Sequence, residues 1–192
     1  LKSLPKNGES VCGDNVVCGK ISGGKYAVIL SDGMGSGKNA AKISKTAIEL
    51  LQQFLNAGFE KSNSVNMIGS AIMLGNSETF TTIDAVTVDL YTGQTEFIKA
   101  GANTSYVKTA KSVRKLSSTS LPVGIIDDVD IDTSSYCAKD GDIIVLISDG
   151  IQSAADDWFE QYLLNMHEDN PDIISALLLD EAVRNKKQDD DM

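Results

Sequence analysis

The stretch Y-A-V-I-L-S-D-G-M-G-S-G, residues 26–37, decides how this chain folds. Five apolar residues run into Ser31-Asp32-Gly33, a glycine-rich turn follows, and a helical pattern opens at Asn39. An apolar run of this length that stops at glycine predicts a buried strand, so the carboxylate of Asp32 is expected at a strand end, where it can meet a ligand. Gly33 permits a tight turn, which lets its own carbonyl face the same ligand. An ordinary strand-to-helix turn has a similar composition.

Acidic residues also mark the ends of other stretches. The apolar run at residues 143–147 leads into a second triplet, Ser148-Asp149-Gly150, and Gly13-Asp14 precedes a strand pattern. The chain ends on Asp189-Asp190-Asp191-Met192. Mg²⁺ and Mn²⁺ take oxygen ligands, keep several waters and use few protein carboxylates, and two cations that share a carboxylate can clamp a phosphoryl group. Aspartates at several strand ends therefore predict a divalent-metal site.

Three motifs carry a resemblance to a known family: L-S-D-G-M-G-S-G at residues 30–37, S-D-G-I at residues 148–151 and D-D-D-M at residues 189–192. In this order they resemble the PP2C-type (PPM) metal-dependent serine/threonine phosphatases, and among these the bacterial branch typified by stage II sporulation protein E. The resemblance covers nearly the whole chain. Supporting stretches are T-T-I-D at residues 81–84, K-A-G-A at residues 99–102 and L-P-V-G-I at residues 121–125.

Blocks of helical pattern and of antiparallel-strand pattern alternate along the chain, which predicts a layered α+β domain. The resemblance implies more: a PP2C-like sandwich of two antiparallel sheets flanked by helices on both faces, with metals at the cleft between the sheets. A length of 192 residues fits a single domain at residues 1–192. Because the chain starts without methionine and stops inside the last motif, we expect a fragment of a longer chain, cut before its last strand.

The resemblance also assigns the metal site residue by residue. It implies that Asp32 bridges two divalent cations, Mn²⁺ or Mg²⁺, and that the Gly33 carbonyl joins one of them. Asp149 and Asp190 hold the other cation, and Asp14 matches the family's early acidic position, which binds directly or through a water. The expected catalytic residues are Asp32, Asp149 and Asp190. In this scheme a water between the metals loses a proton and attacks phosphorus in line, without a covalent enzyme intermediate.

Two details of the motifs bear on this assignment. Asp190 is preferred to Asp189 because the family pattern places the ligand two residues before Met192. Eukaryotic relatives carry an arginine upstream of the early acid, where it holds phosphate, and the stretch before Asp14 contains no arginine. The substrate phosphate must therefore be held in another way, for instance by the metals alone.

The resemblance implies a phosphoprotein phosphatase that hydrolyses phosphoserine and phosphothreonine. Its branch implies a phosphorylated anti-sigma-factor antagonist as the substrate, in sporulation or stress signalling, and a cytoplasmic domain of a membrane-anchored protein. A non-catalytic pseudophosphatase that only binds partner proteins is the alternative. The presence of Asp14, Asp32, Asp149 and Asp190 favours the enzyme, since a chain that lacked two of them would favour binding alone.

Two helical patterns follow the glycine-rich turn, at residues 39–57 and from Ser62 or Ser64 to residue 74. This helix pair is a candidate homodimer contact. A shift of the pair would move Asp32 and the Gly33 carbonyl, and would so couple metal occupancy to a partner. A static cover over the sheet is the equal alternative.

Other segments have simpler interpretations. Val129 and Ile131 alternate with acidic residues, which predicts a half-exposed strand. Residues 154–166 predict a helix that carries Trp158 and Phe159. The apolar stripes of the two helical patterns that follow the glycine-rich turn are interpreted as core-facing, and no chemistry is attached to them.

Composition and spacing exclude several other classes. The net charge of −10 argues against non-specific nucleic-acid binding, and no apolar run approaches the ~18–20 residues of a membrane span. Neither Cys12 nor Cys137 has an arginine six residues later, as cysteine phosphatases require. A single histidine, His167, near an expected helix end, argues against a Ser-His-Asp hydrolase.

Nucleotide-binding motifs fit less well. A P-loop would need glycine at position 32 and serine or threonine at position 39, where the chain has Asp32 and Asn39. Residues 35–40, G-S-G-K-N-A, do match the dinucleotide pattern G-x-G-x-x-A. That pattern also requires a second parallel strand that ends in an acid, and the chain offers a second helical pattern there instead.

Overall fold

Two antiparallel sheets form the centre of the protein, as a computed structural model shows for residues 1–75, 79–152, 158–185 and 190–192. The larger sheet has the strand order β1-β2-β3-β4-β7 and the smaller one the order β6-β5-β8. The strands of the larger sheet are β1 (Asp14–Ile21), β2 (Lys25–Asp32), β3 (Ile83–Asp89), β4 (Gln94–Ala100) and β7 (Asp132–Cys137). Those of the smaller sheet are β5 (Ser105–Lys108), β6 (Val113–Leu116) and β8 (Ile143–Val145).

The hairpin of β1 and β2 sets the register on which the site depends. A one-turn 3₁₀ segment (Ser22–Gly24) joins the two strands, with Gly23 and Gly24 at φ of 73° and 71°, values that only glycine adopts at low cost. The strands then pair along their full length, from Ile21 opposite Lys25 to Asp14 opposite Asp32. The two strands therefore form a hairpin, and its open end carries two acidic residues side by side.

Two helices, α1 (Gly37–Asn56) and α2 (Lys61–Met73), cover one face of the larger sheet. Their inward residues join those of the sheet in one cluster that includes the fully buried Ile29, Leu51 and Ile98. The start of α2 differs from the prediction. Its N-cap is Glu60, whose carboxylate accepts a hydrogen bond from the Asn63 N–H, and neither Ser62 nor Ser64 takes that place.

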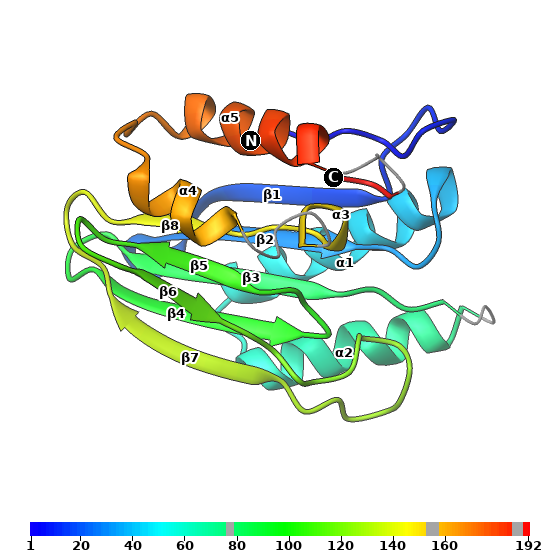
Figure 1. The fold of residues 1–192 in the computed structure, drawn as a ribbon. Helices are drawn as coiled ribbons and strands as arrows, with labels where there is room; N and C mark the ends of the chain where they lie inside the picture. Colours follow the sequence, from blue (N-terminus) through cyan, green and yellow to red (C-terminus); the bar gives the residue numbers. More distant parts are fainter. Residues whose placement is uncertain (76–78, 153–157, 186–189) are drawn as a thin grey trace.

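The remaining helices lie on the opposite side of the molecule, over the smaller sheet (Figure 1). They are α3 (Asp149–Gln152), α4 (Phe159–Asn165) and α5 (Pro171–Asn185). Phe159 of α4 packs on Tyr106 of β5, with ring centroids 4.8 Å apart, and Leu178 of α5 joins the same cluster. The predicted helix at residues 154–166 is found as α4, and its first part lies outside the described residues. The α+β sandwich with helices on both faces is confirmed.

One predicted strand is wrong. Val129 and Ile131 precede β7, which begins at Asp132. Val129 is buried in the cluster beneath α1 and α2, and Ile131 packs against that cluster. The alternation of apolar and acidic residues arises here from a loop that folds over a core, because a loop that covers apolar surface also needs inward apolar anchors. Among the described residues, no helix combines the length and apolar composition needed to cross a membrane.

Candidate metal centre

The first two acids of the candidate site come together through the β1–β2 register. Asp14 opens β1 and Asp32 closes β2, and the two residues pair directly. The side chain of Asp14 is buried, and neither of its carboxylate oxygens has a hydrogen-bond partner in the part of the chain that the structure describes. A buried carboxylate without donors is unfavourable by itself. Such a group fits a site for a cation.

Two further acids reach this hairpin end from distant parts of the chain. Asp149 follows the end of the β8 segment and begins α3, and Asp190 lies in the C-terminal segment. The pKa of Asp32 is raised to about 8, first by burial and then by the negative charges of Asp14 and Asp149, with Asp190 adding a smaller effect. Burial also raises the pKa of Asp14 to about 6, and Asp149 contributes to that rise. The four predicted acidic ligands are therefore neighbours in the fold.

The acids form an extended group rather than a finished coordination shell. Within the described ranges, no three Asp, Glu, His or Cys side chains converge closely enough to hold one ion. The electrostatic coupling nevertheless runs through all of them, since burial and then the Asp190 charge raise the pKa of Asp149 as well. The donor chemistry, all carboxylate oxygen with one buried and unpaired group, suits a hard divalent cation that keeps several waters.

Glycine follows the aspartate in both Ser-Asp-Gly triplets for a reason that the sequence did not reveal. A Cβ at Gly33 would collide with the backbone of Ala40 in α1, and one at Gly150 would collide with the backbone of Asp191. Gly33 has no left-handed φ, whereas Gly35 and Gly37 later in the turn do, at 89° and 71°. The glycine beside each candidate aspartate is thus required for close packing of a second segment.

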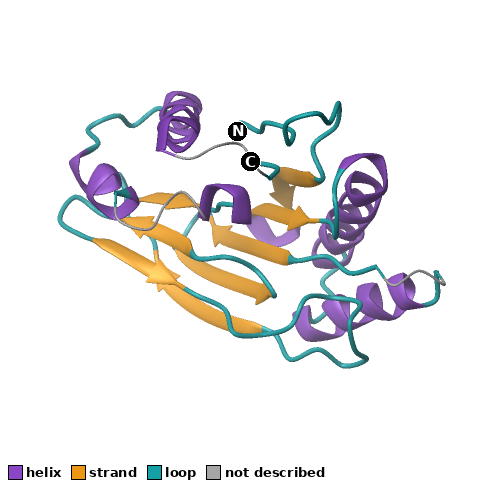
Figure 2. Ribbon diagram, turned by 45° about the vertical axis from the view of Figure 1, so that its right-hand side comes forward, coloured by secondary structure: helices purple, strands orange, loops and turns teal. Residues whose placement is uncertain are grey.

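Asp191 supports the candidate site, and the sequence did not single it out. Its carboxylate is buried and accepts hydrogen bonds from the backbone N–H groups of Lys6 at 2.6 Å and Gly13 at 2.8 Å. The neighbouring backbone of Met192 exchanges hydrogen bonds with Leu4. The two termini are consequently side by side (Figure 2). Asp191 holds the segment that leads into Asp14, and the only signal for it was an extra acid next to the predicted ligand.

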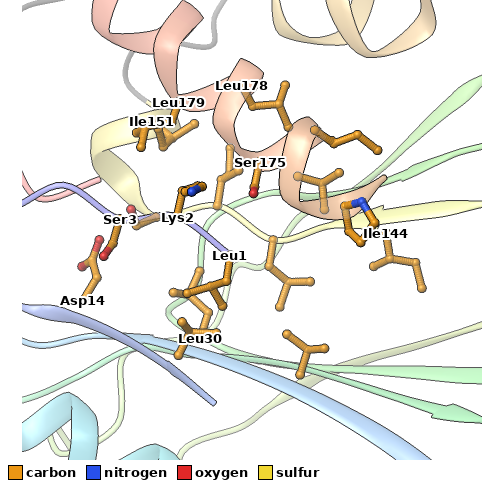
Figure 3. A pocket seen from close by; sticks show the side chains of 18 of the residues that line it. Leu1, Lys2, Ser3, Asp14, Leu30, Ile144, Ile151, Ser175, Leu178 and Leu179 are labelled. Atoms are coloured by element: carbon orange, nitrogen blue, oxygen red, sulfur yellow. The ribbon is translucent and has the colours of Figure 1, made fainter. Parts of the chain in front are cut away.

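A cavity of about 510 Å³ adjoins the site between the sheets and α5. Its walls are mostly apolar and come from β1, β2, β3, β8, α5 and the first three residues. Asp14 lies at one end of the cavity and Ile144 at the other (Figure 3). An apolar wall next to the acids lowers the local dielectric constant, which strengthens the interactions among them.

The family profile and the individual relatives that match this chain point to the same family. The profile of the stage II sporulation protein E family matches residues 22–192. The stage II sporulation proteins E of Priestia megaterium and of Bacillus subtilis (strain 168) are each 31% identical to the chain, over 188 and 196 residues that cover 94% and 97% of it. The chain spans only 32% and 24% of the length of these two relatives.

A solved structure extends the likeness to three dimensions. The PP2C phosphatase domain of SpoIIE from Bacillus subtilis, solved with a fragment of its regulatory domain, superimposes with a TM-score of 0.89 at 30% identity. The match covers 100% of this chain and 58% of that one. The fold predicted from the motifs is therefore the fold of a PP2C phosphatase domain.

Proposed function

We propose, since the chain belongs to the stage II sporulation protein E family, that it is a metal-dependent phosphatase domain that hydrolyses phosphoserine and phosphothreonine in proteins. The observation that carries this proposal is the group of Asp14, Asp32, Asp149 and Asp190, which four separate segments bring to one end of the sheets. A purely structural role would not gather four acids whose burial and mutual repulsion raise the pKa values of three of them.

The residues of the chain have distinct tasks in this proposal. Asp32 would hold both divalent cations, Asp149 and Asp190 one of them, and the Gly33 carbonyl and Asp14 would complete the ligand set. When bound, the cations supply the positive charge that ionises a water and neutralises the phosphate oxygens. Because the pKa of Asp32 is raised to about 8, its carboxyl group keeps a proton near neutral pH without metal. The site therefore takes up cations in exchange for protons.

Hydrolysis of a generic phosphoester, such as p-nitrophenyl phosphate, with and without Mn²⁺ tests the proposal. We expect a manganese-dependent rate that falls to background in Asp149→Asn. Asp180→Asn is the matched control, because Asp180 is an exposed aspartate of α5, and it should keep the full rate. A wild-type protein that binds partners but shows no manganese-dependent rate would favour the non-catalytic pseudophosphatase.

The natural substrate is proposed from the family branch. We propose a phosphorylated anti-sigma-factor antagonist, dephosphorylated at serine, in sporulation or stress signalling. The chain would then work in the cytoplasm as one domain of a longer, membrane-anchored protein, and both relatives named above are longer than this chain. Mass spectrometry of such a phosphoprotein after incubation with the domain tests the assignment. Retention of its phosphate, while generic phosphoesters are cleaved, would point to another target.

The helix pair α1–α2 is proposed as a homodimer contact and as the element that conveys a partner's binding to Asp32. Met67 and Met73 of α2 are exposed by 47% and 37%, which is unusual for apolar side chains on a helix that also packs on a core. Sedimentation of wild type and of Met67→Glu tests this contact. A wild type that stays monomeric at high protein concentration would contradict the proposed homodimer contact.

The single domain at residues 1–192 is proposed to be completed by one more strand after Met192. Two structural features support this. In the described part of the chain β8 pairs on one side only, with β5, and its residues line the apolar cavity. An extension that continues the chain beyond Met192 should raise the thermal stability and reduce binding of a dye that recognises apolar cavities. An extension without either effect would contradict the added strand.

A further inference from the structure

The backbone of Asp32 is held by two threonine side chains. The Asp32 N–H donates to Oγ1 of Thr82 at 3.0 Å, and the Asp32 carbonyl accepts from Oγ1 of Thr81 at 2.6 Å and from the Thr82 N–H at 2.9 Å. Regular pairing of β2 with β3 stops earlier, at Leu30 opposite Asp84. Beyond that point, hydroxyl groups replace part of the backbone ladder around the proposed metal ligand.

Backbone hydrogen bonds to Val123 hold Thr81 in place. Its backbone exchanges hydrogen bonds with Val123, from the Thr81 N–H at 3.0 Å and from the Val123 N–H at 2.8 Å. Both side chains are fully buried. The Ser31 hydroxyl lies 2.7 Å from Oγ1 of Thr81, so Ser31 can donate to Thr81 while Thr81 donates to the Asp32 carbonyl. Each hydroxyl in this chain can then donate one hydrogen bond, from Ser31 to Thr81 and from Thr81 to the Asp32 carbonyl.

We infer that Thr81 and Thr82 are positioning residues for Asp32 and that they tune the affinity of the proposed metal site. The inference rests on the proposed function. Each hydroxyl is carried directly on Cβ, so a short side chain holds the backbone of Asp32 through a hydrogen bond that serine could also make. With both backbone groups of Asp32 held, its carboxylate leaves the strand end in one direction, toward Asp14 across the β1–β2 pair.

A purely structural role for these threonines predicts a different result. Loss of a buried hydrogen bond lowers the stability of the fold wherever it occurs, and it leaves ligand affinity unchanged. A positioning role moves metal affinity, because groups that orient metal ligands typically change it about 10–100-fold when they are removed. Direct binding of Mn²⁺ separates the two, since it requires no catalysis.

Thr82→Val is the decisive variant, because Thr82 is only partly buried and valine has nearly the same shape. We expect Mn²⁺ affinity, measured by titration calorimetry, to fall about tenfold or more. Thr82→Ser keeps the hydroxyl and should restore the wild-type affinity. The KM for p-nitrophenyl phosphate at saturating Mn²⁺ should stay within about twofold of wild type, because the threonines act on the metal ligand and not on the phosphoester.

Thr109→Val is the matched control. The Thr109 hydroxyl also accepts a backbone N–H at 3.0 Å, from Ser112 in the β5–β6 turn, and it is also partly buried. The Thr109→Val variant should be less stable than wild type and should bind Mn²⁺ with unchanged affinity. If Thr82→Val does not fold, Thr82→Ala removes the same hydroxyl at this partly buried position and should lose Mn²⁺ affinity about tenfold or more, and a wild-type affinity there would overturn the inference.

The results also separate this inference from the proposed function. Equal Mn²⁺ affinities for wild type, Thr82→Val and Thr109→Val would refute the positioning role and leave the phosphatase proposal intact. Equal losses in Thr82→Val and Thr82→Ser would refute it too, because the hydroxyl would then not be the cause. A wild type that binds no Mn²⁺ would refute the proposed function, and the positioning role with it.

Discussion

The two faces of the five-stranded sheet are built for different purposes. On the face beneath α1 and α2, Ile29, Leu51 and Ile98 are fully buried in one continuous cluster. On the face toward the smaller sheet, Phe97 packs well, but the β1–β2 half borders the cavity of about 510 Å³ (Figure 3). That second face also ends in acidic residues. One face supplies stability, and the other supplies space and charge.

The period of a strand produces this division with few residues. Successive side chains point to opposite faces, so Ile29 packs under the helices while Leu30 lines the cavity and Asp32 ends the strand. Acids that repel one another when metal-free reduce stability. The filled face must compensate for the face that carries the site, and the predictions below test this division.

The largest effect is expected for Asp32→Asn. Its phosphatase activity should fall by more than about a hundredfold, since even groups outside the ligand shell cost 10–100-fold. Its metal-free thermal stability should rise, because a neutral amide removes an acid whose pKa burial and then the neighbouring carboxylates raise to about 8. Assays in metal-depleted and then Mn²⁺-replenished buffer, with thermal unfolding in chelator, measure both. Full activity would contradict the ligand role.

The next effect concerns a buried ion pair on the site-bearing face. Lys99 Nζ lies 2.8 Å from Asp84, and both side chains are about 3% exposed. Burial lowers the pKa of Lys99 and raises that of Asp84, while their mutual attraction opposes both shifts. Lys99→Met leaves Asp84 buried and unpaired, and it should cost about 3–5 kcal/mol in chemical denaturation.

Two further variants show whether the loss of stability in Lys99→Met comes from the unpaired buried charge. The double variant Lys99→Met with Asp84→Leu should recover most of the lost stability, because neither charge then remains buried alone. Lys45→Met is the control, since Lys45 forms an exposed pair with Glu49 on α1, and it should cost under about 0.5 kcal/mol. A double variant as unstable as the single one would show that the pair holds the sheets together by its geometry.

Matched leucine truncations compare the two faces directly. Leu51→Ala, on the filled face, should destabilise the domain by about 2–5 kcal/mol. Leu30→Ala, beside the cavity, should cost less, at or below the low end of that range, because its side chain already faces empty space. Urea unfolding of both variants without metal measures the difference. Equal losses would mean that the two faces are equally well packed.

The sequence allowed the elements of this fold to be predicted better than their contacts. The apolar run before Asp32 is a local signal, and it formed a strand as predicted. The role of Asp191 was missed because its carboxylate bonds to Gly13, 178 residues earlier in the chain. The alternation at Val129 suggested a strand, since pattern alone cannot separate a strand from a loop that covers a core.

The candidate site shows the same limit. The Ser-Asp-Gly motifs led to Asp32 and Asp149, but the motifs gave no reason for glycine beyond a turn. The structure shows that Gly33 must admit the backbone of α1 and Gly150 that of Asp191. Such requirements come from segments that meet only after folding. The assignment of individual ligands stays a prediction until metal binding is measured on the variants described above.

The last effect is a pH dependence of the metal-free domain. The pKa values of Asp14 and Asp32 are raised to about 6 and about 8, whereas an unfolded chain releases these protons near pH 4. Between about pH 4 and pH 8 the folded state therefore holds more protons than the unfolded state, and stability falls as the pH rises. Above about pH 8 this contribution is constant.

Thermal unfolding in chelator at pH 5, 6.5 and 8 measures this dependence. We expect Tm to fall steadily over that range, with Asp32→Asn flattening the upper part, where Asp32 still holds its proton. Saturating Mn²⁺ should flatten the whole curve, because the cations replace the protons on the carboxylates. A Tm that rises from pH 5 to pH 8 without metal would mean that the acids are paired with donors in solution. The site-bearing face would then not be the source of instability in this sheet.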